Sequence, residues 1–165
     1  MNVVKYLFLF GCSLVLLSIV IFIIRSHAFI RRKKEADLNL SESIYALALL
    51  VAAAIVLIPV LHVLDLDFDI VQKFYPEKML VTLVNSGSLI SMAGLGLFLL
   101  FFIAGRGLST LFFYRRNALI EFNANNLGYA LLRSGLVLCL SILLSPLCSP
   151  LLQLLMPTIT TLFYR

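Results

Sequence analysis

The chain has 165 residues, of which 62% are hydrophobic and 13% are charged, and its mean hydropathy is +1.07. Soluble domains are about half apolar and about one quarter charged, so this composition excludes an ordinary soluble domain and indicates a membrane protein. The length suits one small helical bundle without a large soluble domain beside it. The net charge of +5 is less informative than the distribution of charge between loops.

Four apolar stretches are long enough to cross a membrane, since about 20 apolar residues in a helix span the hydrocarbon core. The predicted spans are Tyr6–Ile24, Ile44–Leu64, Leu80–Ala104 and a fourth that begins near Leu127 and continues past Ser145. The first stretch is longer than the apolar core of a signal peptide, and a basic segment without a clear cleavage site follows it. We therefore expect a retained helix there.

The C-terminal segment stays apolar beyond the point where the fourth span should end. A straight helix from Leu127 to Met156 would be about 45 Å long, against a hydrocarbon core of about 30 Å. Pro146, Pro150 and Pro157 interrupt this stretch, and proline kinks or ends helices. We expect a bent fourth helix whose last turns lie along the outer membrane interface.

The three connections between the spans differ in charge. Residues 25–42 and 106–126 are rich in Lys and Arg, whereas residues 65–78 are net acidic. Basic connections tend to stay in the cytoplasm, which predicts both termini and the acidic connection on the periplasmic side. The acidic connection contains Asp65, Asp67 and Asp69. A calcium loop would need more ligands and a glycine turn, so we expect a solvated loop.

The two halves of the chain are similar in sequence. A shift of 84 residues without gaps aligns residues 31–47 with residues 115–131 and gives six identities in 17 positions. The identities include Arg, Asn and Tyr, which are scarce here, and they exceed the one or two expected by chance. The similarity predicts two tandem two-helix units, residues 1–70 and 71–165, with parallel topology and a pseudo-twofold axis along the membrane normal.

A polar segment opens the second helix of each predicted unit. A helix start leaves four backbone N–H groups without partners, and Asn, Ser and acidic side chains accept hydrogen bonds from them. The residues in question are Asp37, Asn39 and Ser41 in the first unit, and Glu121, Asn123 and Asn125 in the second. Helix capping is the main role that we expect for them.

This arrangement resembles a bacterial inner-membrane family known as domain of unknown function 350. The resemblance is carried by NANNLGYALLRSGLVLCLSILLS in the second unit and, more weakly, by LNLSESIYALALLVAAAIVL in the first. It covers most of the chain, to about Pro146. It implies an integral membrane protein, without an established activity. Gly94 and Gly96 fit the glycine-rich first helix of the family's unit, whereas the first unit has only Gly11 there.

Arg133 carries the strongest functional signal. It lies about six residues, or roughly 9 Å, into the fourth predicted span, and arginines in the hydrocarbon core cost several kcal/mol and often mark function. Its counterpart in the first unit is Leu49. Two alternatives are open: the side chain snorkels to the cytoplasmic surface or forms a structural pair, or it lines a site inside the bundle. The expected acceptors are Asn126, the group Ser86, Ser88 and Ser91, or a lipid phosphate.

Small residues and surface arginines complete the candidates. Small residues let membrane helices approach closely, and the predicted packing positions are Gly87, Gly94, Gly96, Gly128 and Gly135. Ser88 and Ser91 lie on the same surface of the third span. The alternative to helix packing for this surface is that it lines a polar pathway. Clustered cations beside a span attract anionic lipids or determine topology, and the positions concerned are Arg31, Arg32, Arg106, Arg115 and Arg116.

The sequence contains no pattern that predicts a metal, a cofactor, an enzyme active site or a nucleic-acid interface. The three cysteines lie singly in apolar runs, where they are expected to pack as small hydrophobic residues. The sequence therefore favours a non-enzymatic, multi-pass inner-membrane protein that contacts the lipid bilayer and acts as a homo-oligomer or as the anchor of a partner. The alternative is a small oligomeric channel or transporter that uses Arg133 and the Ser/Gly face of the third helix.

Overall fold

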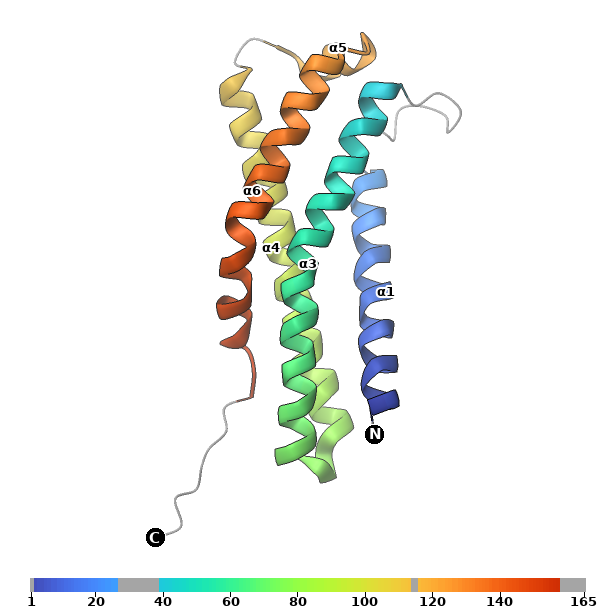
Figure 1. The fold of residues 1–165 in the computed structure, drawn as a ribbon, viewed down its shortest axis with the longest axis vertical. Helices are drawn as coiled ribbons and strands as arrows, with labels where there is room; N and C mark the ends of the chain where they lie inside the picture. Colours follow the sequence, from blue (N-terminus) through green and yellow to red (C-terminus); the bar gives the residue numbers. More distant parts are fainter. Residues whose placement is uncertain (1, 27–38, 114–115, 158–165) are drawn as a thin grey trace.

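The computed structural model describes residues 2–26, 39–113 and 116–157. Within these residues the chain is all-α and contains no β-strand, which confirms the predicted fold class. The elements are α1 (Asn2–Ser26), α3 (Leu40–Phe74), the 3-10 turn η1 (Pro76–Lys78), α4 (Met79–Phe112), the short α5 (Ala118–Asn123) and α6 (Leu127–Gln153). The four long helices lie side by side, and α5 covers one end of the bundle (Figure 1).

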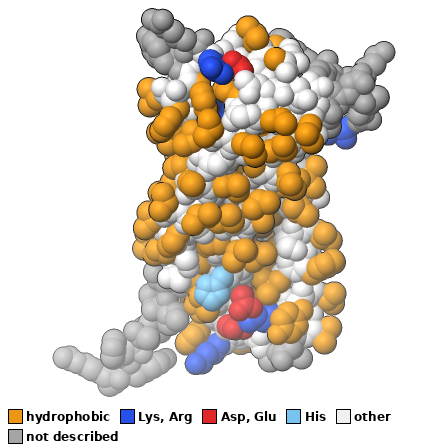
Figure 2. Space-filling model, turned by 45° about the horizontal axis from the view of Figure 1, so that its top comes forward, with side chains coloured by type: hydrophobic (Ala, Val, Ile, Leu, Met, Phe, Trp, Pro, Cys, Tyr) orange, Lys and Arg blue, Asp and Glu red, His pale blue; other side chains and the backbone are white. Residues whose placement is uncertain are grey.

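The outer surface of the bundle is suited to lipid. All four long helices are long and apolar enough to cross a membrane. Large hydrophobic side chains point outward along all of them, for example Phe22, Ile58, Met92 and Leu143. Figure 2 shows hydrophobic side chains over the middle of the bundle and charged side chains near its ends. Contiguous exposed apolar surface of this extent is unfavourable in water, and the chain is a multi-pass membrane protein.

Helices α3 and α4 are longer than the predicted spans, with 35 and 34 residues. Each is about 50 Å long, against a hydrocarbon core of about 30 Å. The predicted solvated loop after Leu64 was wrong, because α3 continues through Asp65 to Phe74. The reason is a helical apolar face: Leu64, Phe68 and Val71 have the spacing i, i+4, i+7, and all three are buried.

The fourth helix continues past two prolines. Pro146 and Pro150 lie inside α6, which ends at Gln153. The helix stops before Pro157, in agreement with the preference of residues that precede proline for extended backbone. The predicted position of the last turns of this helix along the outer membrane interface stays a prediction, and residues 158–165 lie outside the described residues.

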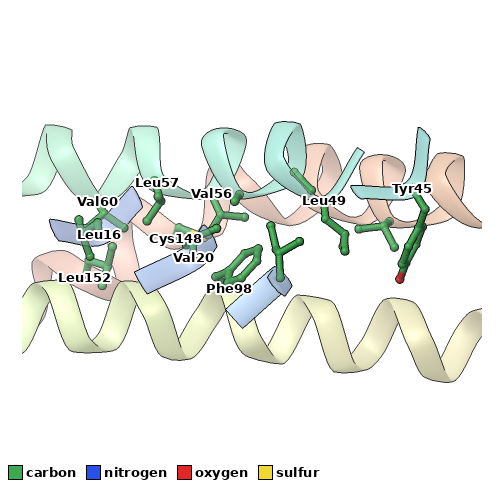
Figure 3. Packing of buried hydrophobic residues seen from close by; sticks show 14 of the residues in the cluster. Leu16, Val20, Tyr45, Leu49, Val56, Leu57, Val60, Phe98, Cys148 and Leu152 are labelled. Carbon is green, nitrogen blue, oxygen red and sulfur yellow. The ribbon is translucent and has the colours of Figure 1, made fainter. Parts of the chain in front are cut away.

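Helix α3 is the centre of the bundle, because it packs against α6, α4 and α1. Its buried small residues Ala48, Ala52 and Ala53 permit close approach of neighbouring helices. Figure 3 shows side chains from all four long helices meeting in one apolar core. The labelled members are Leu16, Val20, Tyr45, Leu49, Val56, Leu57, Val60, Phe98, Cys148 and Leu152.

The tandem repeat stays a prediction. Helices α3 and α6 run in the same direction from the end that α5 covers (Figure 1), as two units of equal topology require. However, α4 packs against both α3 and α6, whereas α1 packs chiefly against α3. A twofold relation would give α1 the same place beside α6 that α4 has beside α3. The predicted boundary between residues 70 and 71 also lies inside α3.

Gly94 determines how closely α3 and α4 approach. A Cβ atom at this position would lie 3.0 Å from Val60 Cγ1 and 3.3 Å from Val60 Cβ, and a helical valine is held in one rotamer. We expect Gly94→Ala to lower the free energy of unfolding by about 1–3 kcal/mol. Gly96 has open space around it, so Gly96→Ala is the matched control and should not destabilise. Unfolding in mixed detergent measures both, and equal losses would contradict the close approach.

Candidate functional site

The connection between α5 and α6 is a hydrogen-bonded polar turn. Asn126 is the N-cap of α6: its side-chain oxygen accepts from the Tyr129 N–H at 3.2 Å. Its amide nitrogen donates to Glu121 Oε2 at 2.6 Å, and Glu121 Oε1 pairs with Arg116 at 3.5 Å. These contacts bring the predicted residues Glu121 and Asn126 together, and they fix the direction in which α6 leaves the turn.

The same turn also caps the start of α3. The Ser41 N–H, in the first turn of α3, donates to Asn125 Oδ1 at 3.0 Å. Asn125 has a positive φ of 53°, a left-handed conformation in which Asn is enriched. Ser41 Oγ and Asn39 Nδ2 donate to the Phe122 carbonyl at 3.3 and 3.4 Å. Residues about 80 positions apart are thus joined, and the helix start is completed by another part of the chain.

Glu42 satisfies a further donor at the α3 start, where its carboxylate accepts from the Asn39 N–H at 3.1 Å. This is the half of a capping box in which the third helical residue bonds back to the N-cap. The predicted capping role holds for Asn39, which is the N-cap of α3. Asn125 was predicted to cap the fourth helix but accepts from the Ser41 N–H of α3. The N-cap of α6 is Asn126, which was predicted only as an acceptor for Arg133. Asn123 is exposed, and Asp37 lies outside the described residues.

Arg133 lies inside the bundle beneath this polar turn, and only 3% of it is exposed. Its Nη1 donates to the Tyr129 hydroxyl at 2.9 Å. The guanidinium carbon lies 5.2 Å from the centre of the Tyr45 ring, 5.8 Å from Phe122 and 5.9 Å from Tyr129. We call Arg133, Tyr45, Phe122 and Tyr129 the Arg133 cluster.

The Arg133 cluster joins three elements, because its rings come from α3, α5 and α6. The rings also contact one another: Phe122 meets Tyr129 edge-on at 5.5 Å and Tyr45 at 5.4 Å. Desolvated cation–π contacts are worth about 2 kcal/mol or more. The structure therefore contradicts a snorkelling side chain for Arg133. Its contact with Tyr129 fits the structural pair, and a functional site inside the bundle stays a prediction.

The structure separates Arg133 from the serines proposed as its acceptors. Ser86 bonds to Asp67 instead, at 2.6 Å, near the opposite end of the bundle where α3 turns into α4. Ser88 and Ser91 line an open groove between α1 and α4. Ser88 and Ser91 therefore lie on a different surface of the bundle from the buried Arg133.

The groove between α1 and α4 has a volume of about 530 Å³ and is almost entirely apolar. We call it the α1/α4 groove. It exists because these two helices make few contacts with each other. Small residues lie along it, namely Gly11, Cys12, Gly87, Ser88 and Ser91.

The predicted packing glycines differ in their surroundings. Gly87 and Gly94 lie against side chains of other helices. A Cβ atom on Gly96 or Gly135 would meet nothing within 4 Å, and one on Gly128 would meet only Asn126. Arg106 is exposed near the end of α4. Among the candidate anionic-lipid residues, Arg31, Arg32 and Arg115 lie outside the described residues, so this contact stays a prediction.

Sequence reasoning missed the aromatic partners of Arg133 and the burial of Asp67. The contact between Arg133 and Tyr129 was partly predictable, because the two residues have the i, i+4 spacing of one helix face. The second depended on extending α3 beyond Leu64. Within residues 2–26, 39–113 and 116–157, no group of three His, Cys, Asp or Glu residues is placed to hold a metal ion.

Comparisons with protein-family models, with curated proteins and with solved structures find no match to this chain. The resemblance to domain of unknown function 350 therefore stays a prediction.

Proposed function

We propose that this chain is a non-enzymatic membrane component that assembles laterally with a second copy of itself through the α1/α4 groove. The observation that carries the proposal is the groove, an open apolar surface on the lipid side of the bundle. Apolar surface alone drives no association in lipid, whereas small residues allow two helices to approach closely enough for strong packing. Gly11 offers such a place, because nothing lies within 4 Å of a Cβ atom built there.

The rest of the bundle supports a scaffold role. Within the Arg133 cluster, the guanidinium group contacts aromatic rings and a hydroxyl. The polar turn fixes α3, α5 and α6 relative to one another. A rigid bundle with one loosely packed edge is the expected form of a protein that contributes a surface to an assembly. The basic connections favour a bacterial inner membrane with the α5 end in the cytoplasm.

Filling the α1/α4 groove should prevent assembly. We expect Gly11→Leu to reduce co-purification of two differently tagged copies by about tenfold or more, which corresponds to about 1.4 kcal/mol. The matched control is Gly96→Leu, since this glycine also has open space around it but does not line the groove. Single-molecule photobleaching in vesicles provides a second readout. A monomeric wild type, or equal effects of both variants, would contradict the proposal.

The alternative of an oligomeric channel has less support, because Arg133 and the third-helix serines do not share a surface. A pathway through an oligomer would have to be lined by the groove residues alone. Ion flux through vesicles that is abolished by Ser88→Leu and unaffected by the conservative Arg133→Lys would favour this alternative over a scaffold.

A further inference from the structure

A carboxylic acid is buried between α3 and α4 near the end of the bundle opposite α5. Asp67 is 0% exposed. Its Oδ2 lies 2.6 Å from Ser86 Oγ, and its Oδ1 has no hydrogen-bond partner among the described residues. Burying an ionised carboxylate without compensating donors is very costly, and such groups neutralise instead.

The hydrogen bonds of Ser86 decide which form of Asp67 the structure accommodates. Ser86 Oγ lies 2.6 Å from Asp67 Oδ2 and 2.8 Å from the Thr82 carbonyl oxygen, but a serine hydroxyl carries a single hydrogen. If Asp67 is ionised, both neighbours are acceptors and must share that hydrogen. If Asp67 is protonated, its own O–H donates to Ser86 Oγ and the Ser86 O–H donates to Thr82. Only the protonated form gives each short contact its own hydrogen.

Among the described residues, no charged group near this end of the bundle forms an ion pair with Asp67. Lys5 on α1 pairs with Asp65 at 2.8 Å and with Asp69 at 2.7 Å. Residues two positions from Asp67 project about 200° away around the helix, so this pair lies on the other side of α3. The remaining charged residues that the structure describes at this end are Lys73 on α3 and Glu77 and Lys78 in η1. The single charged residue of α4 is Arg106 and that of α6 is Arg133, both toward the α5 end.

We propose that Asp67 and Ser86 form a proton-binding site between α3 and α4, in which Asp67 holds a proton taken from the aqueous phase. Release of that proton leaves a buried carboxylate with a single shared donor. The α3–α4 contact around Phe68, Val71 and Leu83 is then expected to open, which admits water to the carboxylate. The site makes the packing of this helix pair dependent on proton concentration, independently of any assembly through the α1/α4 groove.

Infrared spectroscopy of the membrane-embedded protein tests the proposal directly. With aspartate labelled by carbon-13 at the carboxyl group, we expect a carboxylic-acid C=O band at neutral pH that shifts with the label. The band should be absent in Asp67→Asn and unchanged in Asp65→Asn, whose ion-paired aspartate is the matched control. The wild-type spectrum and Asp65→Asn remain informative if Asp67→Asn fails to fold.

Stability against pH gives an independent readout. The melting temperature of the wild type should fall as the pH rises, because the unfolded chain releases the Asp67 proton at lower pH than the folded protein does. Asp67→Asn should remove that decrease, since its amide can still donate to Ser86. A neutral-pH spectrum without the labelled acid band would overturn the proposal. A sodium-specific stabilisation would also overturn it: the melting temperature of the wild type would rise with sodium chloride but not with choline chloride, and Asp67→Asn would show no such rise. The site would then hold a sodium ion.

Discussion

Arg133→Ala should lower the free energy of unfolding by about 3–5 kcal/mol, as expected when a large buried side chain and its cation–π contacts are removed. The substitution removes the cation from three aromatic rings, breaks the hydrogen bond to the Tyr129 hydroxyl and opens a cavity between α3, α5 and α6. Reversible unfolding in mixed detergent micelles, followed by circular dichroism, measures the loss.

Two variants separate the Arg133 cluster from general effects of truncation. Leu132→Ala changes the neighbouring residue, which is 62% exposed toward lipid, and should cost less than about 1 kcal/mol. Arg133→Lys keeps the charge but not the planar group that stacks on rings and donates in a fixed geometry, so an intermediate loss is expected. If Arg133→Ala were no worse than Leu132→Ala, the cluster would not hold these helices together.

The second large effect is expected at Asn125, where Asn125→Ala should cost about 2–3 kcal/mol. The positive φ of 53° disfavours a side chain such as alanine by about 1–2 kcal/mol. Loss of the acceptor for the Ser41 N–H removes a helix cap worth about 1 kcal/mol. Chemical unfolding of the purified protein gives the total.

The two contributions at Asn125 can be measured apart. Asn125→Gly tolerates the backbone conformation but lacks the acceptor, so it should lose only the cap. Asn125→Asp retains an acceptor at this position and should be the mildest of the three. Asn123→Ala is the control, since Asn123 is exposed in the same segment. Equal stability of the alanine and glycine variants would show that the left-handed conformation carries no cost.

Spans and polar helix starts were predictable from the sequence because both depend on local composition. A long apolar stretch indicates a membrane helix, and the predicted capping residue Asn39 lies at a helix start, where backbone donors are free. The cross-connection from Asn125 to Ser41 was not predictable, because it depends on how α3 and α6 pack. The alignment of the halves does place these residues 84 positions apart, at equivalent positions of the two predicted units.

The acidic end of the bundle shows why the remainder could not be predicted. Asp65, Asp67 and Asp69 have the alternating pattern of a solvated segment, yet they lie in a helix that continues α3. In that helix Asp65 and Asp69 reach Lys5, while Asp67 turns toward α4. Hydropathy treats the three residues alike, whereas the packing of α1 and α4 on either side of α3 distinguishes them.

The polar turn and the Arg133 cluster join α3 to α6 at one end of the bundle. This arrangement requires the first and third connections to lie on the same side of the membrane. Substituted-cysteine labelling in a background without Cys12, Cys139 and Cys148 tests this in intact cells. With a membrane-impermeant maleimide, Arg32→Cys and Asn117→Cys should either both be labelled or both be protected, and Glu77→Cys should show the opposite result. Labelling of positions 32 and 117 from opposite sides would contradict the account.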